Sequence, residues 1–283
     1  MSKKTPLNSV ESSHIRQIVE SEDDFGHEVR VGAAIRGVPA INWQHGGTYT
    51  DPILGKPRQF DYRCCLTKET QSLSLAVECK SLSGSVALAV CGMKRPDNEA
   101  FHDLIRSHSS NYRWSSATLR AKREDAFYLP VEFVGKNLVL INKDRKRSPD
   151  KDIYEGWSQA LSSAVDLVKL ACRSAEDTSV SESFTAILPV VVVPNYRLWK
   201  VVYDDNGSIS ADPSQEDACN LYVGNDIEVG PPESPHTFIF SHVHFFTLAG
   251  FGAFLSRMAI NDHAWSKLFS NKGVEVRTPL SGV

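Results

Sequence analysis

The stretch FDYRCCLTKETQSLSLAVECK, residues 60–80, decides how the rest of the chain is interpreted. Its two apolar arms, 60–66 and 73–80, have the composition of strands, and the polar residues 67–72 between them indicate a hairpin turn. Successive strand residues point to opposite faces, so Glu78 and Lys80 project from the same side, roughly 7 Å apart by the strand rise. The opposite, apolar face of that arm consists of Leu73, Leu75, Val77 and Cys79.

The charged residues of this hairpin suggest a chemistry. Charged side chains on a largely apolar strand are costly to bury unless they are paired or bound to a metal ion. Asp61, on the first arm, can bring a second carboxylate to the edge where Glu78 lies. Two carboxylates suit a hard divalent cation such as Mg²⁺, and a lysine beside them can orient a water molecule or stabilise charge that develops at a phosphate.

Length and composition are those of an ordinary globular protein. The chain has 283 residues, 41% of them hydrophobic and 23% charged, enough for one large domain or two small ones. The net charge of −3 argues neither for nor against a nucleic-acid partner, because a basic groove can lie on an acidic protein. The N-terminus lacks an apolar signal segment, and the longest apolar run, 186–194, is too short for a membrane span. We therefore expect a cytoplasmic protein with no membrane partner.

Six cysteines occur in the chain, and none forms a C-x-x-C pair. Four lie in apolar, strand-like runs. This context favours buried, reduced thiols over zinc ligands or disulfides.

The remaining patterns predict one flexible N-terminal segment, 1–20, and a single domain, 21–283, that carries an insertion at about 94–150 and a C-terminal elaboration at about 205–283. Ser21 is predicted to cap the first helix. Helices are expected over 22–36, 99–107, 152–173 and 248–258. Strands are expected over 40–49, 86–91, 127–133, 137–141, 185–193, 198–204 and 236–246. The polar, Pro-rich stretch 215–235 is expected to be a connection without regular structure.

Two further groups of residues could bind a ligand. The basic residues of the insertion could neutralise phosphates or simply be solvated; they are Arg120, Lys122, Arg123, Lys143, Arg145, Lys146 and Arg147. His242 and His244 share a strand face, with His236 nearby, and could ligate a transition metal. No carboxylate has a matching spacing, so histidines satisfied by the protein or by an interface are the favoured interpretation.

The order of elements resembles that of the PD-(D/E)xK nuclease superfamily, which has the restriction-endonuclease-like fold, and in particular its Mrr-like and resolvase-like branches. The matching segments are 25–29, 51–61, 77–80 and 154–160, and the resemblance covers 22–92 and 151–204. Phe60 stands before Asp61, where the motif's name has proline. The implied fold is α/β, a mixed central β-sheet flanked by helices, with insertions.

The resemblance also implies a role for each matching residue. Asp61 and Glu78 would be metal ligands, and Lys80 would position or activate the attacking water. Glu28 would complete the acidic site, directly or through a water molecule. Gln159 would support the site or contact the nucleic-acid backbone.

The expected function is that of a metal-dependent endonuclease that hydrolyses phosphodiester bonds in DNA with Mg²⁺, for which Mn²⁺ is the alternative ion. Cutting both strands of a duplex needs two active sites or two visits, which makes a homodimer a reasonable expectation. Two alternatives stay open: a nuclease effector that cleaves RNA or tRNA, and a non-catalytic nucleic-acid-binding member of the same fold.

Overall fold

The most apolar strand of the chain, β10 (Ser183–Val193), lies inside a large mixed β-sheet. It pairs in parallel with β5 (Gln71–Cys79) on one side and with β14 (His236–Thr247) on the other. All its residues from Ala186 to Val193 are buried, because both faces of the sheet are covered at this point. This confirms the expectation of a central strand at 185–193.

The computed structural model describes residues 11–22, 25–52, 55–82, 86–96, 99, 101–108, 113–120, 132–142, 150–177, 183–229, 235–269 and 274–276. The helices are α1 (Ser12–Glu22), α2 (Phe25–Arg36), α3 (Asp150–Asp177), α4 (Leu248–Ile260) and α5 (Asp262–Leu268). The other strands are β1 (Ile41–His45), β2 (Thr48–Thr50), β3 (Pro57–Gln59), β4 (Tyr62–Lys68), β6 (Ala87–Lys94), β7 (Phe101–His108), β8 (Arg113–Arg120), β9 (Phe133–Ile141), β11 (Leu198–Val202), β12 (Ser214–Gln215), β13 (Ala218–Val229) and β15 (Val274–Val276).

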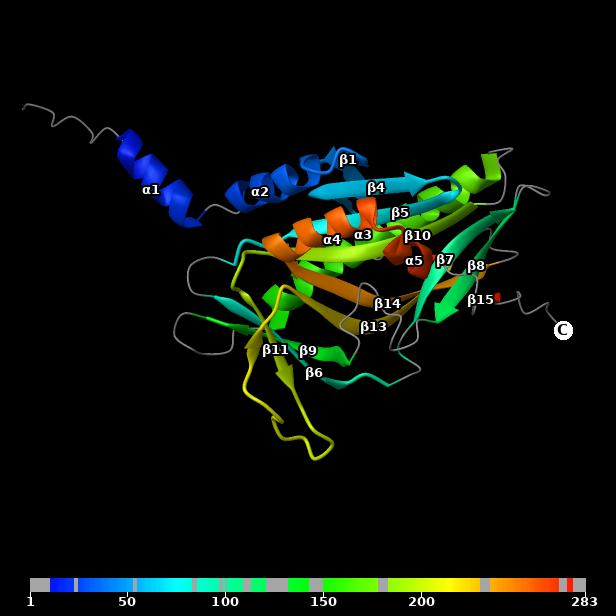
Figure 1. The fold of residues 1–283 in the computed structure, drawn as a ribbon. Helices are drawn as coiled ribbons and strands as arrows, with labels where there is room; N and C mark the ends of the chain where they lie inside the picture. Colours follow the sequence, from blue (N-terminus) through cyan, green and yellow to red (C-terminus); the bar gives the residue numbers. More distant parts are fainter. Residues whose placement is uncertain are drawn as a thin grey trace, which may run out of the picture.

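Helices cover the sheet on both faces, and α1 stands clear of it (Figure 1). On one face, α2, α4 and α5 pack against the apolar side of the β4–β5 hairpin, where Leu75 and Val77 meet residues such as Ile35 and Phe254. On the other face, α3 packs its apolar stripe against β5 and β10, with Ala76 in that interface. None of the helices in the described ranges is both long and apolar enough to cross a membrane.

The segment of the sheet that matters for the site has a simple topology. β1 lies at the edge and pairs antiparallel with β4, which pairs antiparallel with β5. The chain later returns through α3 to β10, which is parallel to β5 with Val191 opposite Glu78. The sheet then continues through β14, β13, β9, β6, β11 and β12. An α/β protein with a large mixed sheet flanked by helices is therefore observed, as expected.

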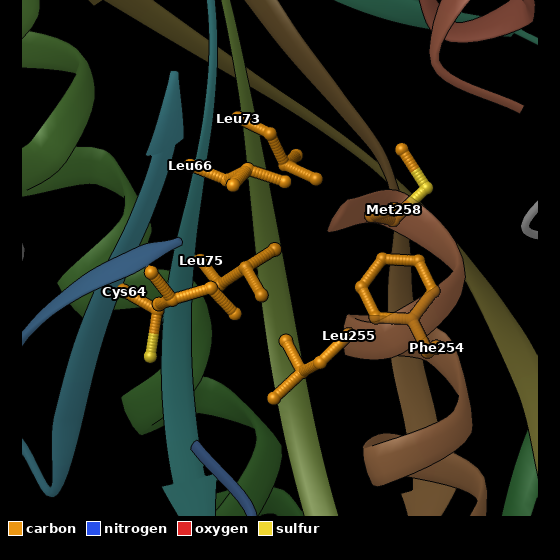
Figure 2. A pocket seen from close by; sticks show the side chains of 8 residues that line it. Cys64, Leu66, Leu73, Leu75, Phe254, Leu255 and Met258 are labelled. Carbon is orange, nitrogen blue, oxygen red and sulfur yellow. The ribbon is translucent and has the colours of Figure 1, made fainter. Parts of the chain in front are cut away.

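A small apolar hollow lies between the β4–β5 hairpin and α4. Figure 2 shows Cys64, Leu66, Leu73 and Leu75 of the hairpin pointing toward Phe254, Leu255 and Met258 of α4, and Ile41 completes the lining. These side chains offer no charge and no metal ligand apart from a buried thiol, whose pKa is raised by burial to about 12. The hollow lies on the face of β5 opposite to Glu78, so it belongs to the core and not to the site described below.

Several local predictions are confirmed. The predicted hairpin exists, although its turn is residues 69–70 and not 67–72, because both strands extend into that stretch. The helix predicted over 152–173 is α3, which is longer at both ends. The strands at 86–91, 198–204 and 236–246 correspond to β6, β11 and β14, and the helix at 248–258 to α4. All six cysteines are free, and four of them are buried.

Four local predictions are wrong or incomplete. Residues 101–108 form the strand β7 and not a helix, because they pair with β8 and with the start of β10. The stretch predicted as a connection contains β13, which pairs along its length with β14. The strand expected over 40–49 is divided into β1 and β2 at Gly46, whose φ is +68°. Ser21 caps no helix start, since α1 continues through it to Glu22.

Candidate active site

Asp61 is held at the start of β4 by a turn of the preceding chain. The backbone N–H of Gly46 donates to the carbonyl of Asp61, and that of Phe60 donates to the carbonyl of Gly47, each at 3.0 Å. Gly47 is required here, because a Cβ would lie 2.4 Å from Cζ of the Phe60 ring. The Asp61 carboxylate then accepts a hydrogen bond from the backbone N–H of Cys79 at 2.6 Å, which places it beside the end of β5.

Glu78, Lys80 and Gln159 meet on the α3 face of the sheet. Lys80 Nζ lies 2.8 Å from Oε1 of Glu78 and donates to Oε1 of Gln159 at 3.1 Å. The backbone of Lys80 is fixed as well, because its N–H donates to the carbonyl of Val192 on β10 at 2.9 Å. The side chain of Glu78 is 8% exposed and that of Lys80 35% exposed. The ammonium therefore lies at a rim that water reaches, above a buried carboxylate.

The carboxylates of this site influence one another electrostatically. Burial raises the pKa of Glu78 to about 7; Lys80 lowers this pKa, while the negative charges of Asp61 and Glu28 raise it. Burial also raises the pKa of Asp61, an effect that the Cys79 N–H and Lys80 oppose and Glu28 reinforces. The three acids thus belong to one electrostatic unit, although they come from α2, from the start of β4 and from the end of β5.

Glu28 belongs to α2, which packs on the opposite face of the β4–β5 hairpin from α3. Its Oε1 lies 2.5 Å from Nε2 of His45, and the hydroxyl of Tyr62 donates to its backbone carbonyl at 3.2 Å. The His45 ring stacks on Tyr62 with centroids 4.6 Å apart. The carboxylate of Glu28 is therefore paired with His45 and is not hydrogen-bonded to Asp61, Glu78 or Lys80.

The predicted metal ligands are not gathered into a three-residue centre. Within the described ranges, no group of three or more His, Cys, Asp or Glu side chains is close enough together to hold a metal ion. The donor set still fits Mg²⁺ chemically, because this ion is commonly held by one or two carboxylates and completes its shell with water. Asp61 and Glu78 are the two carboxylates of the site that lie at adjoining strand ends.

Two residues of the site were not predicted. His45 bonds Glu28 across 17 positions of sequence. Tyr49 is buried and its hydroxyl donates to the backbone carbonyl of Gln159 at 3.4 Å. Burial, and then the negative charges of Asp51 and Glu78, raise the pKa of Tyr49 to about 12. No periodicity marks either residue, so the sequence carries no local signal for them.

The predicted basic groove lies almost wholly outside the described residues. This holds for Lys122, Arg123, Lys143, Arg145, Lys146 and Arg147. Arg120 ends β8, whose backbone alone is described. The phosphate contacts expected of these residues stay a prediction.

His242 and His244 are buried on β14 beside Asn220 and Tyr222 of β13. Arg95 donates to Nε2 of His242 at 3.1 Å, and Nδ1 of His242 bonds the hydroxyl of Ser241 at 2.8 Å. Both ring nitrogens of His242 are thus occupied by protein groups. This supports the interpretation of His242 as a satisfied histidine and argues against it as a metal ligand.

Comparisons with known proteins add no relative: no family model, no curated protein and no solved structure matches this chain.

Proposed function

We propose that the protein is a Mg²⁺-dependent endonuclease of the restriction-endonuclease-like fold, acting on DNA. The observation that carries the proposal is the meeting of Asp61, Glu78, Lys80 and Gln159 at one end of the β4–β5 hairpin. The surrounding topology supports it: a helix, an antiparallel meander, a long helix and a strand parallel to the last strand of the meander.

The charge balance of the site favours a bound cation. Of the five predicted residues, Glu28, Asp61 and Glu78 bring three carboxylates and Lys80 brings one ammonium. An ordinary salt bridge would balance one carboxylate, and His45 adds a positive charge only when it is protonated. The remaining negative charge at a partly buried position is what a divalent cation would neutralise.

Each residue of the chain has a defined task in this proposal. Asp61 and Glu78 would hold the ion, which when bound would stabilise the charge that develops on the phosphate oxygens. Lys80, held by Glu78 and Gln159 at the exposed rim, would orient the attacking water for in-line attack on phosphorus and stabilise the negative charge nearby. The burial of Glu78 keeps this arrangement in a medium of low dielectric, where such charges act more strongly.

The test is cleavage by isosteric variants. Asp61→Asn and Glu78→Gln should each abolish nicking of plasmid DNA in Mg²⁺, and a chelator should abolish nicking by the wild type. A matched control is Glu216→Gln, which removes a carboxylate that also pairs with a lysine, Lys200, at 2.6 Å. Unchanged nicking by the Glu78→Gln protein would remove the proposal.

Substrates and ions distinguish the alternatives. Plasmid, single-stranded DNA and total RNA offered under one Mg²⁺ condition would separate a DNA nuclease from a nuclease for RNA or tRNA. A calorimetric titration that shows no binding of Mg²⁺ or Mn²⁺ would favour the non-catalytic member of the fold.

A further inference from the structure

An exposed tryptophan lies on the edge strand beside the candidate active site. Trp43 of β1 is 43% exposed, although tryptophan is usually among the largely buried residues. Its ring meets Tyr62 edge-on, with centroids 6.4 Å apart. The guanidinium carbon of Arg36, at the end of α2, lies over the ring at 5.8 Å from its centroid. Trp43 and Arg36, together called the edge platform below, thus place an exposed aromatic ring next to a positive charge.

The edge platform is connected to the site through Tyr62. Trp43 and His45 are two residues apart on β1 and therefore project from the same side of the strand, roughly 7 Å apart by the strand rise. Both contact the ring of Tyr62, and His45 holds Glu28. Figure 1 shows β1 and α2 side by side at this edge of the sheet. Trp43 is paired with Cys64 and so lies on the α2 face of the sheet, whereas Lys80 and Gln159 meet on the α3 face. A single strand that leaves the site around the edge strand β1 could place a neighbouring nucleotide on the edge platform.

Arg36 brings a positive charge to the edge platform. It is exposed and forms no ion pair with a carboxylate of the described residues. The site itself carries an excess of carboxylates, which repel the phosphates of a substrate. A guanidinium without a carboxylate partner beside such a site offers the phosphate backbone a contact that the acids do not.

We propose that the edge platform stacks an unpaired base of the substrate while Arg36 contacts its flanking phosphate. This inference rests on the proposed nuclease function and narrows the substrate to a single strand or to a duplex opened near the cut. Every base presents a π-face that can stack on an aromatic ring, whereas the bases of an intact duplex stack on one another and present none. Stacking on exposed aromatic rings and arginine is how proteins bind single strands without sequence preference.

The experiment measures binding apart from cleavage. Full-length Asp61→Ala protein is titrated with a labelled oligo(dT) and with a blunt duplex of equal length, at several salt concentrations. Adding Trp43→Ala should weaken oligo(dT) binding about tenfold or more and duplex binding less than about twofold. Trp43→Phe should restore most of the affinity, and Arg36→Ala should reduce the salt slope by about one.

A matched control removes another exposed aromatic ring. Tyr203 is 37% exposed and forms a bridge with Ile209 just after β11, which lies near the end of the sheet opposite to β1. Tyr203→Ala should leave oligo(dT) binding unchanged. Thermal unfolding of each variant checks that the sheet edge still folds.

The outcomes are separable from those of the proposed function. An equal loss for single strand and duplex, no loss in Trp43→Ala, or no binding of oligo(dT) by the parent protein would each overturn the edge platform. Equal cleavage by the wild-type and Asp61→Ala proteins would overturn the nuclease while leaving a selective effect of Trp43 intact.

Discussion

Two regions of the same sheet bury titratable side chains, and burial shifts the pKa upward in one and downward in the other. At the end of the β4–β5 hairpin, burial raises the pKa of the Glu78 carboxyl to about 7. On β14 and the neighbouring strand β7, burial lowers the pKa of His244 to about 3 and that of His102 to about 4. We call the second region, with Arg95, His102, His242 and His244, the histidine face. In both regions, burial disfavours the charged form of a titratable group.

The two regions differ in whether the polar groups of the network are all bonded to other protein groups. Around His242, on the histidine face, the hydrogen bonds close on the protein itself. Arg95 can only donate, so Nε2 of His242 must accept, and the proton of this neutral ring is on Nδ1, where it donates to Ser241. The hydroxyl of Ser241 then donates to the carbonyl of Phe101 at 2.5 Å. This chain of bonds has one consistent direction, as expected of a structural network.

At the hairpin end the network is open. Lys80 is bonded to Glu78 and Gln159, yet a third of its side chain faces solvent, and the acids outnumber it. Burial alone therefore does not mark a reactive site. What distinguishes the hairpin end is an unbalanced charge at a rim that a ligand can reach.

The largest expected effect comes from removing the ammonium at that rim. Lys80→Met should lower the rate of plasmid cleavage by about 10³-fold, because the water loses its orienting group and the phosphate its nearby positive charge. The free energy of unfolding should fall by roughly 2 kcal/mol, because the Lys80 side chain is partly exposed but the Glu78 carboxyl that loses its partner is buried. Single-turnover cleavage and urea unfolding measure the two quantities. In the control Lys200→Met, which breaks the pair with Glu216, cleavage should persist.

The opposite pattern is expected at the histidine face. Arg95 is fully buried and donates to His242 and to the carbonyl of Phe133 at 2.9 Å. Arg95→Leu leaves two buried acceptors without a donor and should destabilise the fold by roughly 4 kcal/mol. Cleavage per folded molecule should stay unchanged.

A double-mutant cycle checks that this loss arises from the bond to His242. Urea unfolding of Arg95→Leu, His242→Leu and the double variant should show non-additive losses. Additive losses, or a loss of cleavage in folded Arg95→Leu protein, would contradict the assignment of this face as structural.

The sequence predicts the parts of the fold in which the pattern is local. The alternation along 71–79 puts Leu75 and Val77 in one core and Glu78 toward α3, as observed. Residues 101–108 mislead, because Phe101, Leu104 and Ile105 have helical spacing, while pairing with β8 and β10 makes them a strand. The sequence of β13 does not have the pattern of a strand for a related reason: its polar residues are tolerated only because they pair with β14.

The candidate site follows the same rule. Glu78 and Lys80 can be predicted to lie together because two residues on one strand share a side. Asp61 follows from the hairpin. The contacts of Gln159 with Lys80, across 79 positions, and of His45 with Glu28 depend on how α3 and α2 dock on the sheet, which no local pattern records.

The dependence of stability on pH tests whether the fold holds His102 in its neutral form. The unfolded chain takes up a proton at His102 near its ordinary pKa of 6.5, whereas the folded pKa is about 4 because the ring is buried. This stability is present above pH 6.5 and is lost as the pH falls toward 4. His102→Gln keeps a donor for the Leu268 carbonyl and cannot titrate.

The gap in unfolding free energy between wild type and His102→Gln should therefore narrow by roughly 2 kcal/mol from pH 7 to pH 5. Denaturant unfolding at each pH measures it, and the remaining histidines cancel because both proteins contain them. A gap that stays constant with pH would show that His102 is not held neutral by the fold.

The smallest expected effect tests how Gln159 acts. Its Oε1 accepts the hydrogen bond from Lys80 at 3.1 Å, so it is a positioning residue that acts through the ammonium. Gln159→Leu should lower kcat by about tenfold with little change in KM, whereas Gln159→Glu, which keeps the acceptor, should restore most of the rate. A rise in KM at constant kcat would instead assign Gln159 to the nucleic-acid backbone. In that case the hydrogen bond between Gln159 and Lys80 would not contribute to the chemistry. Only the excess of negative charge would then distinguish the hairpin end from the histidine face.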